Sequence, residues 1–320
     1  MSASITASEP LRPGLWNHMR RLWPRWTLLP SLPFVLWCIY CLGRGEKRWE
    51  LVVLMFAIPA LAYWNDTTKK LFVGMLPIGL VGLLYDGMRF TKNVGLTPES
   101  VHVLDLRAHE IALFGVQLAD GTRGTLHDWF QAHHATWADL YFALPYGTFL
   151  YVPLIYSVVL YRADFRALQR YTWAFFLVNV AGFLTYHLYP AAPPWYFHAH
   201  GGHVDLAAYA STGVPLSRVD AYLGVPYFAR LYGRSNDVFG AVPSLHVAYP
   251  LLMVIEVWRH HGKAARTFAI SFWLSTCVAA VYLDHHWVID VVVGLIYTVV
   301  IYLAMNRAMP TLKVRAPTAA

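Results

Sequence analysis

Three ionisable side chains lie at the ends of long apolar segments in the C-terminal third of the chain. His246 comes just before one apolar run, and His286 and Asp290 lie where the runs 268–283 and 291–305 meet. Ionisable groups at such positions are costly to keep, so they are often functional. We therefore expect these three residues to form a site.

The spacing of His286 and Asp290 suits a nucleophilic imidazole. Residues four apart lie on one face of a helix, within hydrogen-bonding reach. The carboxylate can accept one ring N–H, fix the tautomer and leave the other nitrogen free to attack. Attack on phosphorus would give a phosphohistidine and divide a transfer reaction into two steps. The alternative is a His–Asp pair that only satisfies its own hydrogen bonds at a helix end.

His246 ends the sequence Pro243-Ser244-Leu245-His246. Because proline is favoured in the first turn of a helix, we expect free backbone N–H groups at Ser244, Leu245 and His246. Such a helix start is a ready anion site, so we count Ser244 among the substrate-binding residues. His246 can protonate a leaving alkoxide and later deprotonate an incoming hydroxyl. The alternative is a histidine that only caps a helix at the membrane interface.

The composition indicates an all-α, polytopic membrane protein. Of the 320 residues, 57% are hydrophobic and only 13% are charged, whereas about a quarter are charged in a soluble domain. The net charge of +7 would favour nucleic acid as a partner of a soluble chain. Basic residues gathered in cytoplasmic loops explain it better here, so we expect no nucleic-acid partner.

The pattern of apolar runs predicts about eight transmembrane helices, since a helix needs about 20 apolar residues to cross a bilayer. The second run is short. The runs lie at about 27–43, 50–64, 70–88, 141–161, 171–190, 240–258, 267–284 and 286–306.

These runs divide the chain into four predicted parts. They are a cytoplasmic or interfacial segment (1–26), two accessory transmembrane helices (27–64), a catalytic transmembrane core (65–308) and a cytoplasmic tail (309–320). Two insertions in the core, 91–140 and 191–237, are expected on its outer surface.

The basic residues predict the orientation of these parts. Most Lys and Arg residues fall in segments that share a side with both termini, which places the termini in the cytoplasm and the site on the extracytoplasmic face. Because we see no eukaryotic-type tail, we expect a bacterial inner membrane.

The histidine motifs resemble those of the type 2 phosphatidic acid phosphatase superfamily. That superfamily has a Pro-Ser-x-His and a His-x-x-x-Asp motif, as at 243–246 and 286–290. The stretches 189–196, 239–246 and 282–287 are most similar to its inositol phosphorylceramide synthase branch. The resemblance covers roughly residues 85–305 and implies a six-helix phosphatase-type catalytic core.

The resemblance also implies a reaction. His286 is the nucleophile, Asp290 orients it, and His246 serves as acid and then as base, with no metal and no other cofactor. Inositol phosphate would pass from phosphatidylinositol to ceramide or a similar lipid alcohol. The implied partners are a phospholipid donor, a lipid-alcohol acceptor and the bilayer; the sequence carries no signal for an oligomeric state.

The sequence departs from the wider superfamily where phosphate is held. Ala280 stands where the superfamily has an arginine, and a Lys-x₆-Arg-Pro motif is missing. The synthase branch shares these departures, which favours a transferase. Other cations must then hold the phosphate, although each could instead be an interfacial anchor. The candidates are Arg234, Arg89, Lys92 and Arg230.

Other side chains leave further alternatives open. Trp195 and Tyr196 are expected to line a lipid headgroup pocket. A lipid phosphate phosphatase with the same triad is one alternative, and a transporter or metal-handling protein that uses His198, His200 and His203 is another. We expect those three histidines to be solvated and not to bind metal, and we predict no role for His285.

Overall fold

The computed structural model describes residues 14–91, 94–233 and 237–309. Lys92, Arg234, the first half of the N-terminal segment and the tail from 310 lie outside these ranges. Within them, the one sheet is a two-stranded antiparallel ribbon of β1 (Val116–Gln117) and β2 (Arg123–Gly124). Helices make up almost all of the remaining regular structure.

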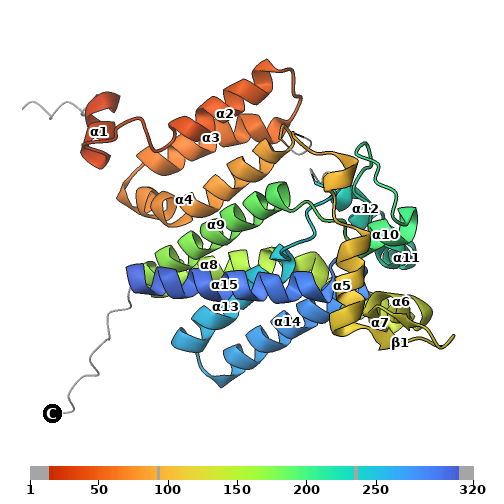
Figure 1. Cartoon of the computed structure of the whole chain (residues 1–320). Coiled ribbons are helices and arrows are strands. Elements are labelled where there is room, and N and C mark those ends of the chain that lie inside the picture. Colours follow the sequence, from red (N-terminus) through yellow and green to blue (C-terminus); the bar gives the residue numbers. More distant parts are fainter. Residues whose placement is uncertain (1–13, 92–93, 234–236, 310–320) are drawn as a thin grey trace, which may run out of the picture. The chain divides into compact units, whose positions relative to one another are not determined.

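The chain forms two compact units, residues 1–76 and 77–320. The first contains α1 (Leu15–Leu22), α2 (Leu32–Gly43), α3 (Trp49–Tyr63) and the start of α4 (Asp66–Met88). Its helices α2 and α3 lie side by side (Figure 1) and bury Cys38, Cys41 and Leu51 between them.

The second unit is built around α13. Its long helices are α7 (Thr136–Thr148), α8 (Tyr151–Ala163), α9 (Phe165–Leu188), α13 (Leu245–His260), α14 (Lys263–Tyr282) and α15 (Val288–Ala308). Helix α13 packs against α8, α9, α14 and α15. Because apolar residues cover most of its circumference, α13 is stable only in this surrounded position.

The helices confirm a helical membrane protein. Among the residues described, α4, α14 and α15 are long and apolar enough to span a bilayer, and α7 with α8 makes a fourth candidate bent by 44°. Helices α2 and α3 are apolar but shorter. All eight predicted apolar runs are helical over most of their length, while the count of eight spans stays a prediction.

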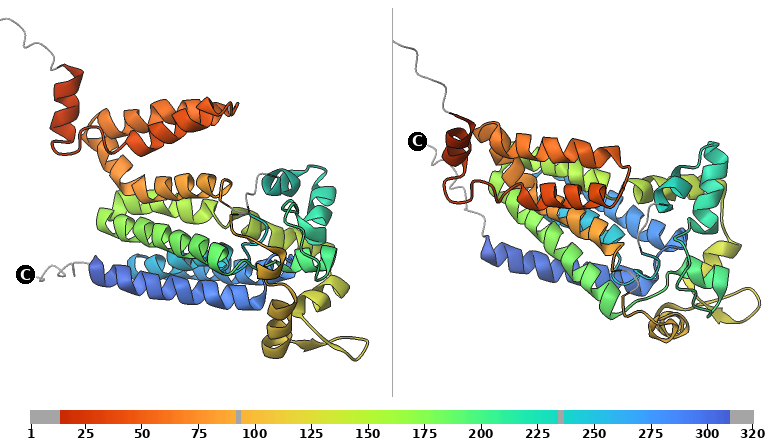
Figure 2. Two further views of the ribbon diagram at one scale, coloured as in Figure 1. Left: turned by 45° about the horizontal axis from the view of Figure 1, so that its top comes forward. Right: turned by 90° about the horizontal axis from the view of Figure 1, so that it is seen from above.

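Short helices from the two insertions gather at one end of the long helices of the second unit (Figure 2). We call this group the cap. It consists of α5 (Leu104–Phe114), α6 (Leu126–Ala132), α10 (Pro194–His200), α11 (Gly213–Leu223) and α12 (Tyr227–Tyr232). Isolated parallel bridges join His102 to Ala191 and Ala191 to Gly240, which links both insertions to the segment that leads into α13.

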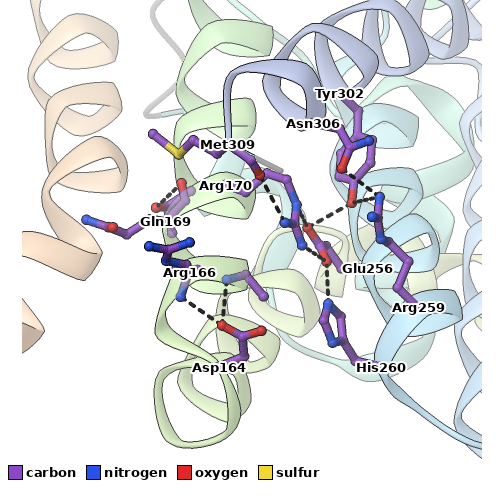
Figure 3. A network of polar contacts seen from close by, with 12 residues as sticks. Asp164, Arg166, Gln169, Arg170, Glu256, Arg259, His260, Tyr302, Asn306 and Met309 are labelled. Atoms are coloured by element: carbon purple, nitrogen blue, oxygen red, sulfur yellow. Dashed lines mark hydrogen bonds and ion pairs between the residues drawn. The ribbon is translucent and has the colours of Figure 1, made fainter. Parts of the chain in front are cut away.

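A buried ion pair joins three long helices near the C-terminal end of α13 (Figure 3). Arg170 of α9 contacts both carboxylate oxygens of Glu256 of α13, at 2.7 and 2.8 Å, and neither side chain is exposed. The hydroxyl of Tyr302 on α15 donates to the same carboxylate at 2.9 Å. A buried ion pair is tolerated only when further hydrogen bonds satisfy it in this way.

Candidate active site

His286 lies in the tight turn between α14 and α15, and it is only 5% exposed. Its Nδ1 lies 3.0 Å from the carbonyl oxygen of Ala241 and 3.3 Å from Oδ2 of Asp290. Both partners are acceptors, so Nδ1 carries the hydrogen and Nε2 carries the lone pair. The ring therefore has the tautomer that a nucleophile needs.

Asp290 is fixed through Oδ2, the oxygen that faces the His286 ring. It is completely buried in the first turn of α15, and its Oδ2 also accepts the backbone N–H of Trp287 at 2.9 Å. The positive end of the helix dipole favours a carboxylate at this position.

His246 completes a line of three side chains. Its Nδ1 lies 2.9 Å from Nε2 of His286. The His246 ring stacks on Tyr146, with centroids 4.6 Å apart and planes 6° apart, and packs against Phe149 at 4.0 Å. The structure thus brings together the three predicted catalytic residues, in the order Asp290, His286, His246.

The segment before α13 differs from the prediction. The helix begins at Leu245, Ser244 is its N-cap, and the Val242–Pro243 peptide is cis. The N–H of Ser244 donates to the carbonyl oxygen of Asp290 at 3.0 Å, so the prediction of a free N–H at Ser244 was wrong. The Ser244 hydroxyl is fully buried and makes no hydrogen bond with the part of the chain that the structure describes.

Burial sets the protonation of the nucleophile. Loss of water lowers the pKa of His286 to about 4, although the hydrogen bond to Ala241 opposes the shift. The ring is therefore neutral at pH 7, with its Nε2 lone pair intact.

Hydrogen bonds from residues of the cap hold the turn that carries His286. Nε2 of His127 on α6 lies 2.9 Å from the carbonyl oxygen of His286 and donates to it. Asp284 has a left-handed backbone with φ 68°, which is unfavourable for an aspartate unless neighbours hold it. Its carbonyl accepts the N–H of Trp195 at 2.8 Å, and its carboxylate lies 2.7 Å from Nδ1 of His198.

The structure leaves His198 partly exposed, as predicted, but it also places the ring between two carboxylates. Its other ring nitrogen lies 3.1 Å from Asp128, which also pairs with Arg107 at 2.8 Å. Burial favours the neutral ring, but the hydrogen bonds to Asp128 and Asp284 outweigh it and raise the pKa of His198 to about 9. Sequence reasoning missed this role because both partners are distant along the chain.

Glu110 of α5 was also missed. Its carboxylate is buried and accepts the N–H groups of Val288 and Ile289 at 2.9 and 3.1 Å. It therefore caps the start of α15, two residues before Asp290. Burial raises the pKa of Glu110 to about 7 against the effect of these two bonds. A lone glutamate in an amphipathic segment was the only sequence signal.

The sequence profile of the PAP2 superfamily matches residues 118–304. The chain belongs to the PAP2 superfamily. A phosphoinositol dihydroceramide synthase of Bacteroides thetaiotaomicron is 34% identical over 82% of this chain and 84% of its own length. The inositol phosphorylceramide synthase catalytic subunits aur1 of Schizosaccharomyces pombe and AUR1 of Saccharomyces cerevisiae are each 28% identical over 79% of this chain.

The chain spans 58% and 61% of those two fungal proteins. No solved structure matches it. The relatives confirm the predictions of the superfamily, of its inositol phosphorylceramide synthase branch and of a phosphotransferase.

Within this PAP2 protein, Ala280 has a structural part at the position where the sequence lacks the superfamily's arginine. It is fully buried, and its carbonyl accepts the N–H groups of His285 and His286 at 3.1 and 3.0 Å. These bonds tighten the end of α14 into the turn, so the backbone of Ala280 helps to position the nucleophile.

The described candidate cations differ in their surroundings. Arg89 pairs with Asp86 at 3.3 Å and lies over the ring of Phe90. Arg230 is exposed on α12. Arg234 and Lys92 lie outside the described residues, so their predicted role stays a prediction.

Trp195 and Tyr196 pack in the interior of the cap. Both are buried in a cluster with Val101, Val103 and Phe239. The Tyr196 hydroxyl accepts the N–H of Asp205 at 2.8 Å. These contacts show that Trp195 and Tyr196 stabilise the cap. Their predicted role in a lipid headgroup pocket stays a prediction. In the described ranges, no three His, Cys, Asp or Glu side chains form a group that could hold a metal ion.

Proposed function

We propose that this membrane phosphotransferase moves inositol phosphate from phosphatidylinositol to ceramide, dihydroceramide or a similar lipid alcohol, and releases diacylglycerol. The observation that carries the chemistry is the line from Asp290 through His286 to His246, with 2.9 Å between the two imidazoles. The printed names of the relatives support the choice of headgroup and acceptor.

In the first step, Nε2 of His286 attacks phosphorus. A P–N bond forms while the bond from phosphorus to the glycerol oxygen breaks, and protonated His246 gives its proton to that oxygen. The negative phosphodiester favours protonation of His246 when the donor lipid enters. Asp290 and the Ala241 carbonyl retain the Nδ1 hydrogen and stabilise the charge on the phosphohistidine.

In the second step, neutral His246 takes the proton of the lipid alcohol. The alkoxide oxygen attacks phosphorus, the P–N bond breaks, and His286 returns to its neutral form. Because His286 and Asp290 are buried, little water competes with the alcohol, which favours transfer over hydrolysis.

We expect neutral hydrogen-bond donors and cationic side chains to bind the phosphate together. The Ser244 hydroxyl has no hydrogen-bonding partner among the described residues, and the N-terminus of α13 favours an anion. We propose Arg234, Arg89, Lys92 and Arg230 as the cations near the phosphate, with Arg234 first because it precedes His246 by twelve residues.

We further propose eight transmembrane helices in a bacterial inner membrane, with the site on the extracytoplasmic face. The distribution of Lys and Arg and the bacterial relative support this placement. Cysteine labelling at position 209, where Tyr209 is 88% exposed in the second insertion, with a membrane-impermeant reagent on intact cells, would test the side.

The test of the reaction is a lipid assay on the purified protein with phosphatidylinositol and a short-chain ceramide. We expect phosphoinositol-ceramide and diacylglycerol in equal amounts, and neither with His286→Ala. Release of a water-soluble phosphate without a transfer product would assign the protein to phosphatase chemistry with the same triad. If a wide panel of phospholipids gave no product at all, the enzymatic function itself would be contradicted.

A further inference from the structure

His285, for which the sequence predicted no role, presents an unused acceptor beside the triad. It is 4% exposed, and its Nδ1 lies 2.8 Å from the carbonyl oxygen of Leu283. Since a carbonyl can only accept, Nδ1 carries the hydrogen and Nε2 the lone pair. This Nε2 is buried and has no hydrogen-bonding partner in the ranges that the structure covers. Buried polar atoms are rarely left in this state unless an ordered water or a ligand satisfies them.

Two tyrosines next to His285 present an unused donor. Edge-to-face contacts place the Tyr232 and Tyr146 rings 4.7 and 5.2 Å from the His285 ring. Their hydroxyls lie 2.7 Å apart and bond to each other. One such bond uses one of the two hydroxyl hydrogens, and neither hydroxyl makes another hydrogen bond to the described part of the chain. The second hydrogen is therefore free for an outside acceptor.

These groups border the reacting atoms. Tyr146 is the ring that stacks on His246, and His246 contacts Nε2 of His286. His285 is the chain neighbour of the nucleophile. A molecule that places its phosphorus at His286 thus extends next to His285 and the tyrosine pair.

We propose that His285 and the Tyr146–Tyr232 pair form a subsite for an alcohol hydroxyl of the substrate. Nε2 of His285 accepts the substrate O–H, and the free tyrosine hydrogen is donated to the substrate oxygen. A hydroxyl is both donor and acceptor and fits this pair. A phosphate oxygen would face the imidazole lone pair and be repelled.

Burial keeps this acceptor in the required form, since it lowers the pKa of His285 to about 3. The inference rests on the proposed transferase function. The hydroxyl has two possible sources there, the inositol of the donor or the lipid-alcohol acceptor, and the two can be separated by kinetics.

The test compares two substitutions of His285 in the full-length protein. His285→Asn keeps a donor near the Leu283 carbonyl and loses the acceptor at Nε2, whereas His285→Gln keeps an acceptor near Nε2. We expect the KM for one lipid to rise about tenfold in the Asn variant and about threefold in the Gln variant. Tyr146→Phe combined with Tyr232→Phe removes both hydroxyls and should raise the KM for the same lipid. A rise for ceramide identifies the acceptor as the source, and a rise for phosphatidylinositol identifies the donor.

A matched control is His261→Asn. His261 also has a buried Nε2 with no hydrogen-bonding partner among the residues described, and an edge-to-face tyrosine, Tyr156, but it follows the C-terminal end of α13. We expect both KM values to stay unchanged in this variant.

Unchanged KM values in His285→Asn would overturn the subsite. The subsite would also be overturned if the Asn and Gln variants lost kcat and thermal stability equally while KM stayed unchanged. His285 would then have only a packing role. Failure of the proposed function looks different, because the wild-type protein itself would then make no transfer product.

Discussion

The Nδ1 hydrogen of His286 determines which nitrogen can attack. Two acceptors share it, the carboxylate of Asp290 and the carbonyl of Ala241. A carbonyl cannot donate, so Ala241 alone already excludes the other neutral tautomer. The charge of Asp290 adds what a carbonyl lacks, because it stabilises the positive ring that forms during transfer.

The substitution Asp290→Asn therefore distinguishes the orientation of the His286 ring from the effect of the negative charge of Asp290. The amide oxygen can still accept the Nδ1 hydrogen or the Trp287 N–H, but the charge is gone. We expect kcat to fall about a thousandfold while the protein stays folded. Steady-state transfer assays and thermal unfolding in detergent check this, and a rate within threefold of wild type would contradict the role of Asp290.

At the scale of elements, the turn between α14 and α15 is positioned by the cap as much as by its own helices. His127, His198 and Glu110 come from three different cap helices and bond to the turn or to the start of α15. The geometry of the nucleophile thus depends on segments outside the long helices.

The charge of His198 predicts a pH dependence. Its pKa is raised from 6.5 to about 9, so the folded protein binds this proton more tightly than the unfolded chain. The stabilisation is fully present below about pH 6.5 and is lost as the pH rises towards 9. We expect the thermal midpoint to fall between pH 7 and 9.5 in the wild type and to change less in His198→Gln. Equal slopes for both proteins would show that His198 is not the titrating group.

A second prediction at this scale concerns the contact between α13 and α15. A Cβ at Gly294 would lie 2.5 Å from the backbone oxygen of Ser244, which cannot move without shifting the start of α13. Gly294→Ala should cost about 1–3 kcal/mol in stability and strongly reduce transfer, because it separates Asp290 from Ser244.

Gly82 of α4 is the matched control for this substitution. An added Cβ there meets no atom within 4 Å, so Gly82→Ala should be neutral or stabilising, by up to about 1 kcal/mol. Thermal midpoints and turnover of the two variants test the contact, and equal behaviour would contradict it.

At the scale of the whole molecule, catalysis and anchoring occupy different ends of α13. Glu256 follows His246 by ten residues, which is about 15 Å along a helix. The Arg170–Glu256 pair and Tyr302 (Figure 3) hold α9, α13 and α15 together at the end of α13 opposite His246.

Removal of one partner should therefore damage stability more than chemistry. Arg170→Met leaves Glu256 buried without its main cation and should cost about 3–5 kcal/mol. Arg170→Met combined with Glu256→Leu should recover much of this loss. The unfolding midpoints of the single and the double variant test this. If the two variants were destabilised equally, Arg170 and Glu256 would not be energetically coupled.

The parts of this molecule that sequence could predict are local. The i, i+4 spacing of His286 and Asp290 and the apolar runs depend only on helix geometry, so the triad and the helices followed from them. The bond from Ser244 to Asp290 is tertiary, and it overturned a prediction made from helix-start rules alone. The roles of His198 and Glu110 escaped notice because their partners lie 70 to 179 residues away.

The contact between the two imidazoles has a consequence for the resting enzyme. While His246 occupies the Nε2 lone pair of His286, the nucleophile is shielded from any electrophile that does not first part the two rings. A histidine-acylating reagent should then modify the empty protein slowly at His286. Without substrate, the contact with His246 therefore protects Nε2 of His286 from reaction. A lipid that separates the two rings exposes this atom.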